Sequence, residues 1–279
     1  ALEPYTTYGP RARVGFLTPV KTERVQLGVG WQIERLSFRD VSPLLEQETV
    51  DGGPTLDVAL GLDRPQRVGA YTGLLTVDLR DHPIEPTLGA YAGLRSAIGT
   101  RLAGGAFEFV QLVPELRGYV PLGPVVLGAR VRAGTFLGDV PATERFFAGG
   151  ASSHRGFGER RLAPTRVGDV MGDEHIVPYG GESMLESSVE ARFPIATWRE
   201  IGIGGVLFLD GGDVREELAD VALRELHWAA GVGLRFRTLV GPIRADLGYR
   251  LNRFDRMPGS DAPASGSRFA FHLSLGEAF

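Results

Sequence analysis

The chain has 279 residues, of which 39 are glycine, with a net charge of -4 and no cysteine. The scattered charge excludes an electrostatic footprint for nucleic acid, and the lack of cysteine excludes a disulfide framework and a thiolate metal site. No run of 18 apolar residues is present, which excludes a transmembrane helix but leaves a membrane β-barrel open. The high glycine content favours many strands joined by tight turns.

Apolar and polar residues alternate with period two along most of the chain, as in strands with one apolar face. Between Val25 and Glu34, for example, every second residue is apolar. We expect about eleven strands, at roughly residues 10–16, 25–34, 67–80, 88–98, 107–120, 125–134, 184–193, 201–210, 228–237, 243–251 and 269–275.

The alternation alone fits either a soluble sandwich or a membrane barrel. The expected connections, however, are alternately short (about 4–7 residues) and long (about 8–45 residues) along the chain. Outer-membrane barrels have short periplasmic turns and long outer loops in that order. We therefore expect an all-β, antiparallel transmembrane β-barrel with a wet lumen. Val232 and Leu247 should face lipid, and Ser188, facing the lumen, should tolerate a charge.

The longest connection, about Gly138 to Gly181, shows neither helix nor strand periodicity. A structureless loop of that length is uncommon in a compact domain unless it is functional or disordered. Its phenylalanines and arginines argue against disorder, and its glycines allow tight turns and close approach to a wall. We expect the loop to fold back into the barrel with Arg155 as its anchor.

Several short motifs, in a fixed order, resemble the outer-membrane protein assembly-factor superfamily (BamA/TamA-like, bacterial surface antigen barrels). They are Asp78–Pro86 (DLRDHPIEP), Arg145–Gly150 (RFFAGG, in which Arg145, Phe146, Gly149 and Gly150 start the long loop), Arg155-Gly156-Phe157, Glu190, Phe208–Gly212 (FLDGG), Gly231–Arg235 (GVGLR), Gly241–Asp246 (GPIRAD) and Gly276–Phe279 (GEAF).

The resemblance implies a sixteen-stranded barrel preceded by periplasmic POTRA domains. About eleven strands are expected here, and no POTRA-like segment lies before Pro10. Residues 1–279 are therefore interpreted as the C-terminal part of such a barrel, with the POTRA domains and the first strands absent. A smaller barrel, with Gly53–Leu62 as a twelfth strand, is the alternative.

The resemblance also implies that Arg155, in the Arg155-Gly156-Phe157 motif, reaches into the lumen and pairs with acids on the inner wall. The matching positions here are Glu190 and Asp210. The alternation independently places both on the lumen face of neighbouring strands. The expected role of the pairing is structural, since it would clamp the loop and set the shape of the barrel.

The last strand carries a second expected signal. Its residues match the targeting pattern of outer-membrane barrels and would also form a stripe facing lipid. These residues are Phe269, Phe271, Leu273, Leu275 and Phe279.

No part of the sequence predicts catalysis. Asp78, Arg80 and Asp81 are expected to satisfy free amides at a strand end. The run Ser152-Ser153-His154 lacks the Gly-x-Ser-x-Gly elbow of a nucleophile, and the five histidines lack zinc-ligand spacing. We expect no catalytic residue, no metal site and no cofactor, so the protein is not expected to be an enzyme.

The resemblance implies an outer-membrane barrel that assists folding and insertion of β-barrel proteins. The seam between its first and last strands would offer backbone groups to an incoming strand. The expected location is the bacterial outer membrane, with a periplasmic C-terminus. The expected partners are outer-membrane lipids, nascent β-barrel proteins, and periplasmic or lipoprotein accessory subunits, and not nucleic acid. A two-partner-secretion type transporter pore is the alternative, and a diffusion porin comes third.

Overall fold

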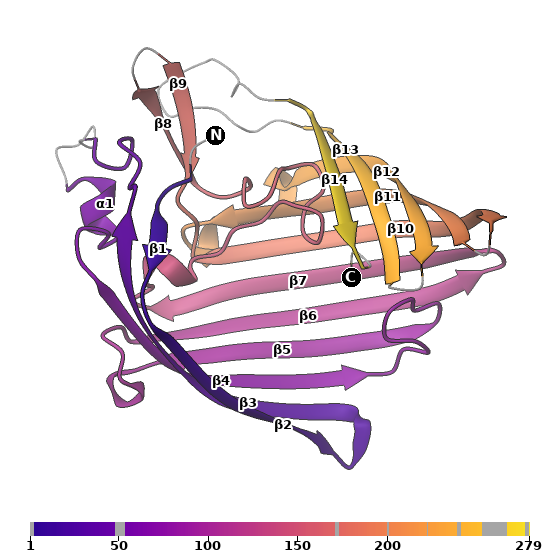
Figure 1. Cartoon of the computed structure of the whole chain (residues 1–279), viewed down its shortest axis with the longest axis horizontal. Coiled ribbons are helices and arrows are strands. Elements are labelled where there is room, and N and C mark those ends of the chain that lie inside the picture. Colours follow the sequence, from indigo (N-terminus) through magenta and orange to yellow (C-terminus); the bar gives the residue numbers. More distant parts are fainter. Residues whose placement is uncertain are drawn as a thin grey trace.

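Twelve strands form one antiparallel sheet that curves like the wall of a barrel (Figure 1). The computed structural model describes residues 3–47, 54–170, 173–199, 201–221, 223–238, 241–252, 267–276 and 279. The strands of this sheet are β1 (Thr6–Tyr8), β2 (Arg11–Val20), β3 (Thr22–Arg39), β4 (Gln66–Asp78), β5 (Gly89–Gly99), β6 (Phe109–Leu122), β7 (Val125–Gly138), β10 (Ser183–Trp198), β11 (Ile201–Arg215), β12 (His227–Thr238), β13 (Gly241–Arg250) and β14 (Phe269–Leu275).

The spatial order of the strands follows the chain. From β3 onward each strand pairs with the next, except that β7 pairs with β10, and β1 and β2 both pair with β3. Among the described residues, β14 pairs with β13 alone and β2 with β3 alone, so the sheet has two edges. Five strands follow the long loop, and the expected antiparallel barrel fold is confirmed.

The connections at the two ends of the sheet differ in length. At one end lie Lys21 and the pairs 123–124, 199–200 and 239–240, together with residues 79–88. At the other end lie residues 40–65, 100–108, 139–182, 216–226 and 251–268. The predicted alternation of short and long connections therefore holds along the chain except at residues 79–88, a connection of ten residues that is longer than the nine residues 100–108 at the other end.

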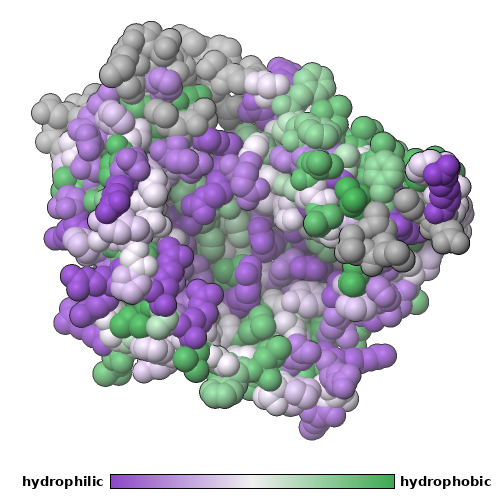
Figure 2. All heavy atoms as spheres, in the orientation of Figure 1, coloured by the Kyte–Doolittle hydropathy of each residue, from purple (hydrophilic) through white to green (hydrophobic). Residues whose placement is uncertain are grey.

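Each strand has one face toward the outside and one toward the inside of the curve. On β13, Leu247 is 42% exposed, whereas its lumen-side neighbour Asp246 is fully buried. On β12, Val232 is 53% exposed and Arg235 is buried. The predicted lipid face at Val232 and Leu247 is thus the outer face of the sheet. Figure 2 shows this view hollowed toward its centre, with hydrophilic side chains around the hollow.

Two expectations about local structure are wrong. The proposed twelfth strand at Gly53–Leu62 is, in its described residues 54–62, an irregular segment with the short helix α1 (Leu56–Ala59). The long loop is not devoid of strands, because β8 (Thr165–Val170) and β9 (Asp173–Pro178) form a separate hairpin. Four 3-10 turns complete the elements: η1 (Arg101–Ala103), η2 (Ala142–Glu144), η3 (Leu218–Asp220) and η4 (Leu223–Glu225).

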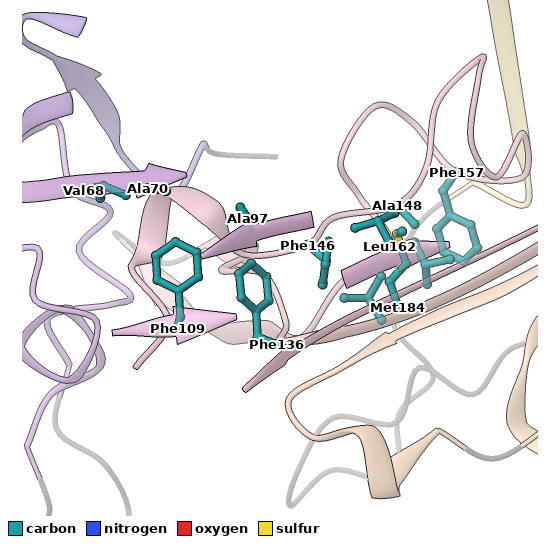
Figure 3. Close-up of a cluster of buried hydrophobic side chains, with 12 residues drawn as sticks. Val68, Ala70, Ala97, Phe109, Phe136, Phe146, Ala148, Phe157, Leu162 and Met184 are labelled. Carbon is teal, nitrogen blue, oxygen red and sulfur yellow. The ribbon is translucent and has the colours of Figure 1, made fainter. Parts of the chain in front are cut away.

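The first part of the long loop runs inside the curve of the sheet, where it forms much of the apolar core (Figure 1). Phe146 of the loop packs against Phe136 of β7, with ring centroids 4.8 Å apart. Leu162 and Phe157 of the loop belong to the same buried cluster as Met184 of β10 (Figure 3). The loop is therefore held against the lumen face by packing as well as by polar contacts.

The connection between β4 and β5 is organised by Asp81. Its Oδ1 accepts hydrogen bonds from the backbone N–H groups of His82, Thr87 and Leu88, at 2.9–3.1 Å. The Thr87 hydroxyl also donates to Asp81 Oδ2, and this bond, followed by the backbone bonds, holds the pKa of the exposed Asp81 carboxyl well below its usual range. The expectation that an Asp here satisfies free amides at the strand end is confirmed.

The two faces of the sheet should respond differently to a charge. Replacing Val232 with Arg on the outer face should lower the free energy of unfolding by roughly 2–4 kcal/mol, because a charge near the bilayer midplane is poorly solvated. The change is measured by urea unfolding of the protein in lipid vesicles.

The matched control is Thr72→Arg. Thr72 lies at mid-strand on β4, half-buried, in line with the buried Ala70 on the lumen side. Its substitution should cost about 1 kcal/mol or less, because the charged group can remain in the polar lumen rather than in lipid. An equal loss of stability on both faces would contradict a lipid-facing outer surface.

Candidate functional site

The loop turns tightly just before Arg155. Gly149 and Gly150 have φ values of +100° and +108°, which residues with a Cβ rarely adopt. A Cβ on Gly149 would lie only 2.4 Å from the carbonyl oxygen of Gly158. The N–H of Gly150 donates to the carbonyl of Phe157 at 3.0 Å. Glycine at these two positions therefore allows a compact turn that presents Arg155 to the wall.

The Arg155 side chain is bound by residues of two neighbouring strands. Asp210 of β11 accepts from the Arg155 backbone N–H and Nε, both at 2.9 Å, and from Nη2 at 2.7 Å. Glu190 of β10 accepts from Nη1 at 2.9 Å, and the Ser188 hydroxyl accepts from Nη2 at 3.0 Å. Arg155, Glu190 and Asp210 are each about 1% exposed. The paired, charge-assisted geometry is the strong form of such bonds.

The charges in this cluster balance. Burial alone would lower the pKa of Arg155, but the hydrogen bonds and charge of Asp210, and then the charge of Glu190, outweigh it and raise the pKa above its usual range. Arg192 supplies a second cation, with its Nε 2.5 Å from Glu190. The Arg155 guanidinium also lies 3.6 Å from the centre of the Phe208 ring, which shields the cluster from water. Two cations thus neutralise two carboxylates in a largely dry site.

Ser188 is not the neutral lumen position that the sequence predicts. It is 2% exposed, and its hydroxyl donates to Asp210 at 2.6 Å while it accepts from Arg155. A charged side chain here would break both bonds and disturb the charge balance. That prediction is wrong, because alternation identifies the lumen face but not which lumen residues the loop covers.

The loop backbone also contacts the last strands. A Cβ on Gly248 of β13 would lie 2.2 Å from the Arg155 carbonyl oxygen, so only glycine fits there. The same oxygen accepts a hydrogen bond from Nε2 of His272 on β14 at 3.2 Å. A Cβ on Gly156 would lie 2.5 Å from the Cβ of Ala229 on β12. The Arg155 segment therefore touches every strand from β10 to β14.

Phe157 completes the motif by packing between two histidines. Its ring meets His154 and His227 edge-on, at 5.1 and 5.5 Å between centroids, with the Arg250 guanidinium 4.8 Å from its centre. His154 is 1% exposed, donates from Nε2 to the His227 carbonyl at 2.8 Å, and accepts at Nδ1 from the Gly156 N–H at 3.3 Å. Burial lowers the pKa of His154 and thereby favours the neutral imidazole. In that neutral form the two hydrogen bonds satisfy both ring nitrogens.

The motif at the start of the loop lies beside the end of the loop. Arg145 donates to the Gly180 carbonyl at 3.1 Å and forms an ion pair with Glu182. The backbones of Phe146 and Gly181 form an isolated β-bridge. These contacts close the base of the loop independently of Arg155.

Two further loop anchors are absent from the sequence prediction. Arg130 of β7 donates from Nη1 to the Ser152 carbonyl at 3.0 Å. Arg244 of β13 donates from Nη2 to the Ala151 carbonyl at 2.7 Å. The sequence alternation places both arginines on the polar face of their strands, and this is the only sequence feature that points to a role in the lumen. It does not indicate that their partners are backbone carbonyls of the loop.

The residues considered for catalysis have other partners. Ser153 donates to Glu186, while His154 donates to the His227 carbonyl, so they do not form a nucleophile–base pair. In the part of the chain that the structure describes, no group of three or more His, Asp or Glu side chains is arranged to hold a metal ion. Nor does any helix in those ranges have the length and apolar character needed to cross a membrane.

The residues of the expected C-terminal signal divide between two environments. Four of them point outward from β14 and are 58–72% exposed: Phe269, Phe271, Leu273 and Leu275. Phe279 instead lies inside, at 6% exposure. A single lipid-facing stripe therefore accounts for the strand residues but not for Phe279.

Arg155→Ala should lower the free energy of unfolding by about 3–5 kcal/mol, since it leaves Glu190 and Asp210 buried without their cation. Arg155→Lys should restore little, because an ammonium cannot reproduce the paired bonds of the guanidinium. Unfolding by urea in vesicles measures both effects.

The control is Arg101→Ala, which removes an arginine side chain that is 81% exposed and should cost little. A double-mutant cycle between Arg155 and Asp210 should give a coupling well above the roughly 0.5 kcal/mol scatter of independent sites. Additive effects would mean that the loop is not anchored at Asp210.

Stability should also depend on pH through His154. Its folded-state pKa is lowered, so the unfolded chain binds the proton more readily, and the stabilisation is complete above about pH 6.5 and lost as the pH falls through the folded value. The free energy of unfolding, measured from pH 8 to pH 5, should fall more steeply in the wild type than in His154→Gln. Equal slopes in the wild type and in His154→Gln would contradict this prediction.

Comparison with known proteins identifies the family. The Omp85 superfamily domain matches residues 2–279. The chain is 30% identical over 210 residues to the outer membrane protein assembly factor BamA of Nitratidesulfovibrio vulgaris, over 73% of this chain and 25% of that protein. It is 27% identical over 145 residues to the chloroplastic outer envelope protein 39 of Arabidopsis thaliana, over 49% of this chain and 34% of that protein.

A solved structure gives the same fold. The crystal structure of BamA from Haemophilus ducreyi lacking POTRA domains 1–3 superimposes with a TM-score of 0.70 and 16% identity, over 97% of this chain and 54% of that one. The chain thus spans between a quarter and about half of the length of these proteins. The curved antiparallel sheet, the lumen loop and the match along the chain lead to one conclusion: this chain belongs to the Omp85 superfamily and has the fold of a BamA-type outer-membrane β-barrel.

Proposed function

We propose that this chain forms the barrel of an outer-membrane protein that assists folding and insertion of other β-barrel proteins, without covalent chemistry. The observation that carries the proposal is the match of residues 2–279 to the Omp85 superfamily domain, together with the 30% identity to a protein named outer membrane protein assembly factor. In the proposed mechanism an incoming strand pairs at the seam beside β14. An edge strand presents unpaired N–H and C=O groups that can pair with an added strand. In a bilayer these groups have no water to bind, so an incoming strand is stabilised there.

The Arg155 clamp supports this role by holding the wall behind the edge. Its guanidinium binds β10 and β11, and its carbonyl lies against β13 and bonds to His272 of β14. A loop fixed to four strands keeps their arrangement when the backbone of β14 gains a partner. The role of the clamp in this proposal is therefore structural.

The proposed location is the bacterial outer membrane, with the outward stripe of β14 in contact with lipid. The end of the barrel with short connections would face the periplasm, as in outer-membrane barrels generally, and β14 ends on that side. The proposed partners are outer-membrane lipids, nascent β-barrel proteins, and periplasmic or lipoprotein accessory subunits.

The proposed domain organisation follows from the partial match to longer relatives. Residues 1–279, with the lumen loop at about 138–181, would be the C-terminal part of a barrel. POTRA domains and the first strands would precede them in the whole protein. The 25% coverage of the bacterial relative supports this arrangement.

Cross-linking during insertion tests the function. The chain has no cysteine, so single cysteines can be introduced by Leu273→Cys, on the outer face of the edge strand β14, and by Leu94→Cys, on the outer face of β5. The full protein is reconstituted in liposomes and given an unfolded client barrel with one cysteine in a terminal strand. We expect faster insertion of the client, and a client disulfide with the cysteine at 273 but not with the control at 94.

The same assay separates the alternatives. Delivery of unfolded client into the vesicle interior, without insertion into the bilayer, would favour a two-partner-secretion type transporter. Equal cross-linking at positions 273 and 94, with no acceleration of insertion, would contradict the proposed function.

A further inference from the structure

The chain leaves the outer face of the sheet directly after β14. Leu275 is 72% exposed on that face, and Gly276 follows with a φ of +86°. Three residues later, Phe279 is 6% exposed inside the barrel, and the C-terminus lies close to the end of β14 in Figure 1. An aromatic side chain at the end of a lipid-facing strand is thus placed in the lumen.

Phe279 lies among one tyrosine and two arginines, which we name the aromatic cage. Its ring centroid is 6.2 Å from that of Tyr119 on β6. The guanidinium of Arg130 on β7 lies 5.2 Å from the ring centre, and that of Arg192 on β10 lies 5.6 Å from it. Nη2 of Arg192 also donates to the Phe279 carbonyl at 3.3 Å. Cations near an aromatic face attract it through the ring quadrupole.

The cage is built into the wall and is separate from the larger apolar cores. Tyr119 and Phe279 form a buried cluster of their own. A Cβ on Gly128 would lie 3.4 Å from the Tyr119 ring and 3.5 Å from the Phe279 ring, in ordinary contact with both, so Gly128 borders the cage. With Phe279 in place, Tyr119 and Arg130 are 2% and 4% exposed.

Two observations indicate that the cage has a hydrogen-bond donor and adjoining space that Phe279 does not use. Arg130 is buried, yet its Nε has no hydrogen-bond partner among the described residues. A cavity of about 220 Å³ adjoins the cage at Arg192. It has room for several waters, or for a side chain of similar size, since a water takes about 30 Å³ of liquid volume.

The cavity is apolar with a cationic rim. Beside Arg192 it is lined by Phe193, Pro194, Val206, Arg235 and Arg237. The connection between β4 and β5 closes it from the opposite wall, with Glu85 3.0 Å from Arg237. This lining suits an apolar residue next to the aromatic one, since Arg192, Arg235 and Arg237 are already paired with Glu190, Asp246 and Glu85.

We infer that the aromatic cage of Tyr119, Arg130 and Arg192 is a binding subsite for the aromatic residue at the end of an outer-membrane β-strand. Phe279 occupies the subsite in this structure, and the strand end of a client protein replaces it during insertion. The identity of the ligand as a client strand rests on the proposed function, whereas the cage and its occupant are features of this chain.

The exchange is tested with a fluorescent peptide that has the sequence of residues 268–279. Its binding to the full protein in detergent micelles is followed by anisotropy. Phe279→Ala empties the cage, so this variant should bind the peptide at least tenfold more tightly than the wild type does. A peptide with alanine in place of its last phenylalanine should lose that gain, although it can still pair along a strand edge.

Two variants serve as controls. Phe271→Ala removes an aromatic side chain from the outer face of the same strand, at 67% exposure, and should bind the peptide as the wild type does. Tyr119→Leu added to Phe279→Ala should abolish the tighter binding. Equal binding of the two peptides to Phe279→Ala, or equal binding of the peptide to that variant and to the wild type, would overturn the inference.

A second measurement applies even if Phe279→Ala does not fold. A peptide whose last residue is the photoreactive p-benzoylphenylalanine is irradiated with the wild-type protein. Cross-links should fall in Phe109–Leu122 or Ser183–Trp198, which carry Tyr119 and Arg192, and cross-links to outward residues alone would overturn the inference. Normal client insertion without peptide binding would refute the subsite but leave the proposed function standing.

Discussion

One buried guanidinium carries much of the arrangement inside this barrel. Removing a cation and two carboxylates from water costs several kcal/mol per ion, so such a cluster persists only when its hydrogen bonds are well made. Arg155 meets that condition with bonds to Asp210, Glu190 and Ser188, while Arg192 balances the second carboxylate. The tight turn at Gly149, the glycine at 248 and the shielding Phe208 ring each make room for this geometry or protect it. The clamp is thus a shared product of the loop and the strands β10, β11 and β13.

The strands could be predicted from the sequence because the two faces of a barrel wall meet two different media. Lipid on one side and a polar lumen on the other impose a period of two, and this alone located β10 to β14 and the outward side chains Val232 and Leu247. The family resemblance added the partners of Arg155, and the alternation placed them on the right face. The structure brings Arg155, Glu190 and Asp210 into direct contact.

What could not be predicted depends on contacts rather than on periodicity. The hairpin β8–β9 pairs residues within a loop, where no layer of lipid enforces alternation. The sequence did not predict the burial of Ser188, nor the hydrogen bonds from Arg130 and Arg244 to the loop. These contacts depend on which loop atoms reach the wall of the barrel. A polar lumen position looks the same in sequence whether it meets water or a loop carbonyl. The inward position of Phe279 depends on the turn at Gly276 and the cage across the lumen, which lie on distant segments.

The position of Arg155 within its loop has a consequence for chain entropy. The loop spans residues 139–182, and the clamp fixes it near the middle. Pinning an interior point converts one large closed loop into two smaller ones, and each added closure removes further conformational freedom. The bonds at Arg155 must offset that loss, while the pairing of Phe146 with Gly181 closes the base regardless. The loop is therefore ordered in two tiers: a base closed by the pairing of Phe146 with Gly181, and a middle held by the buried Arg155 together with Arg130, Arg244 and apolar packing.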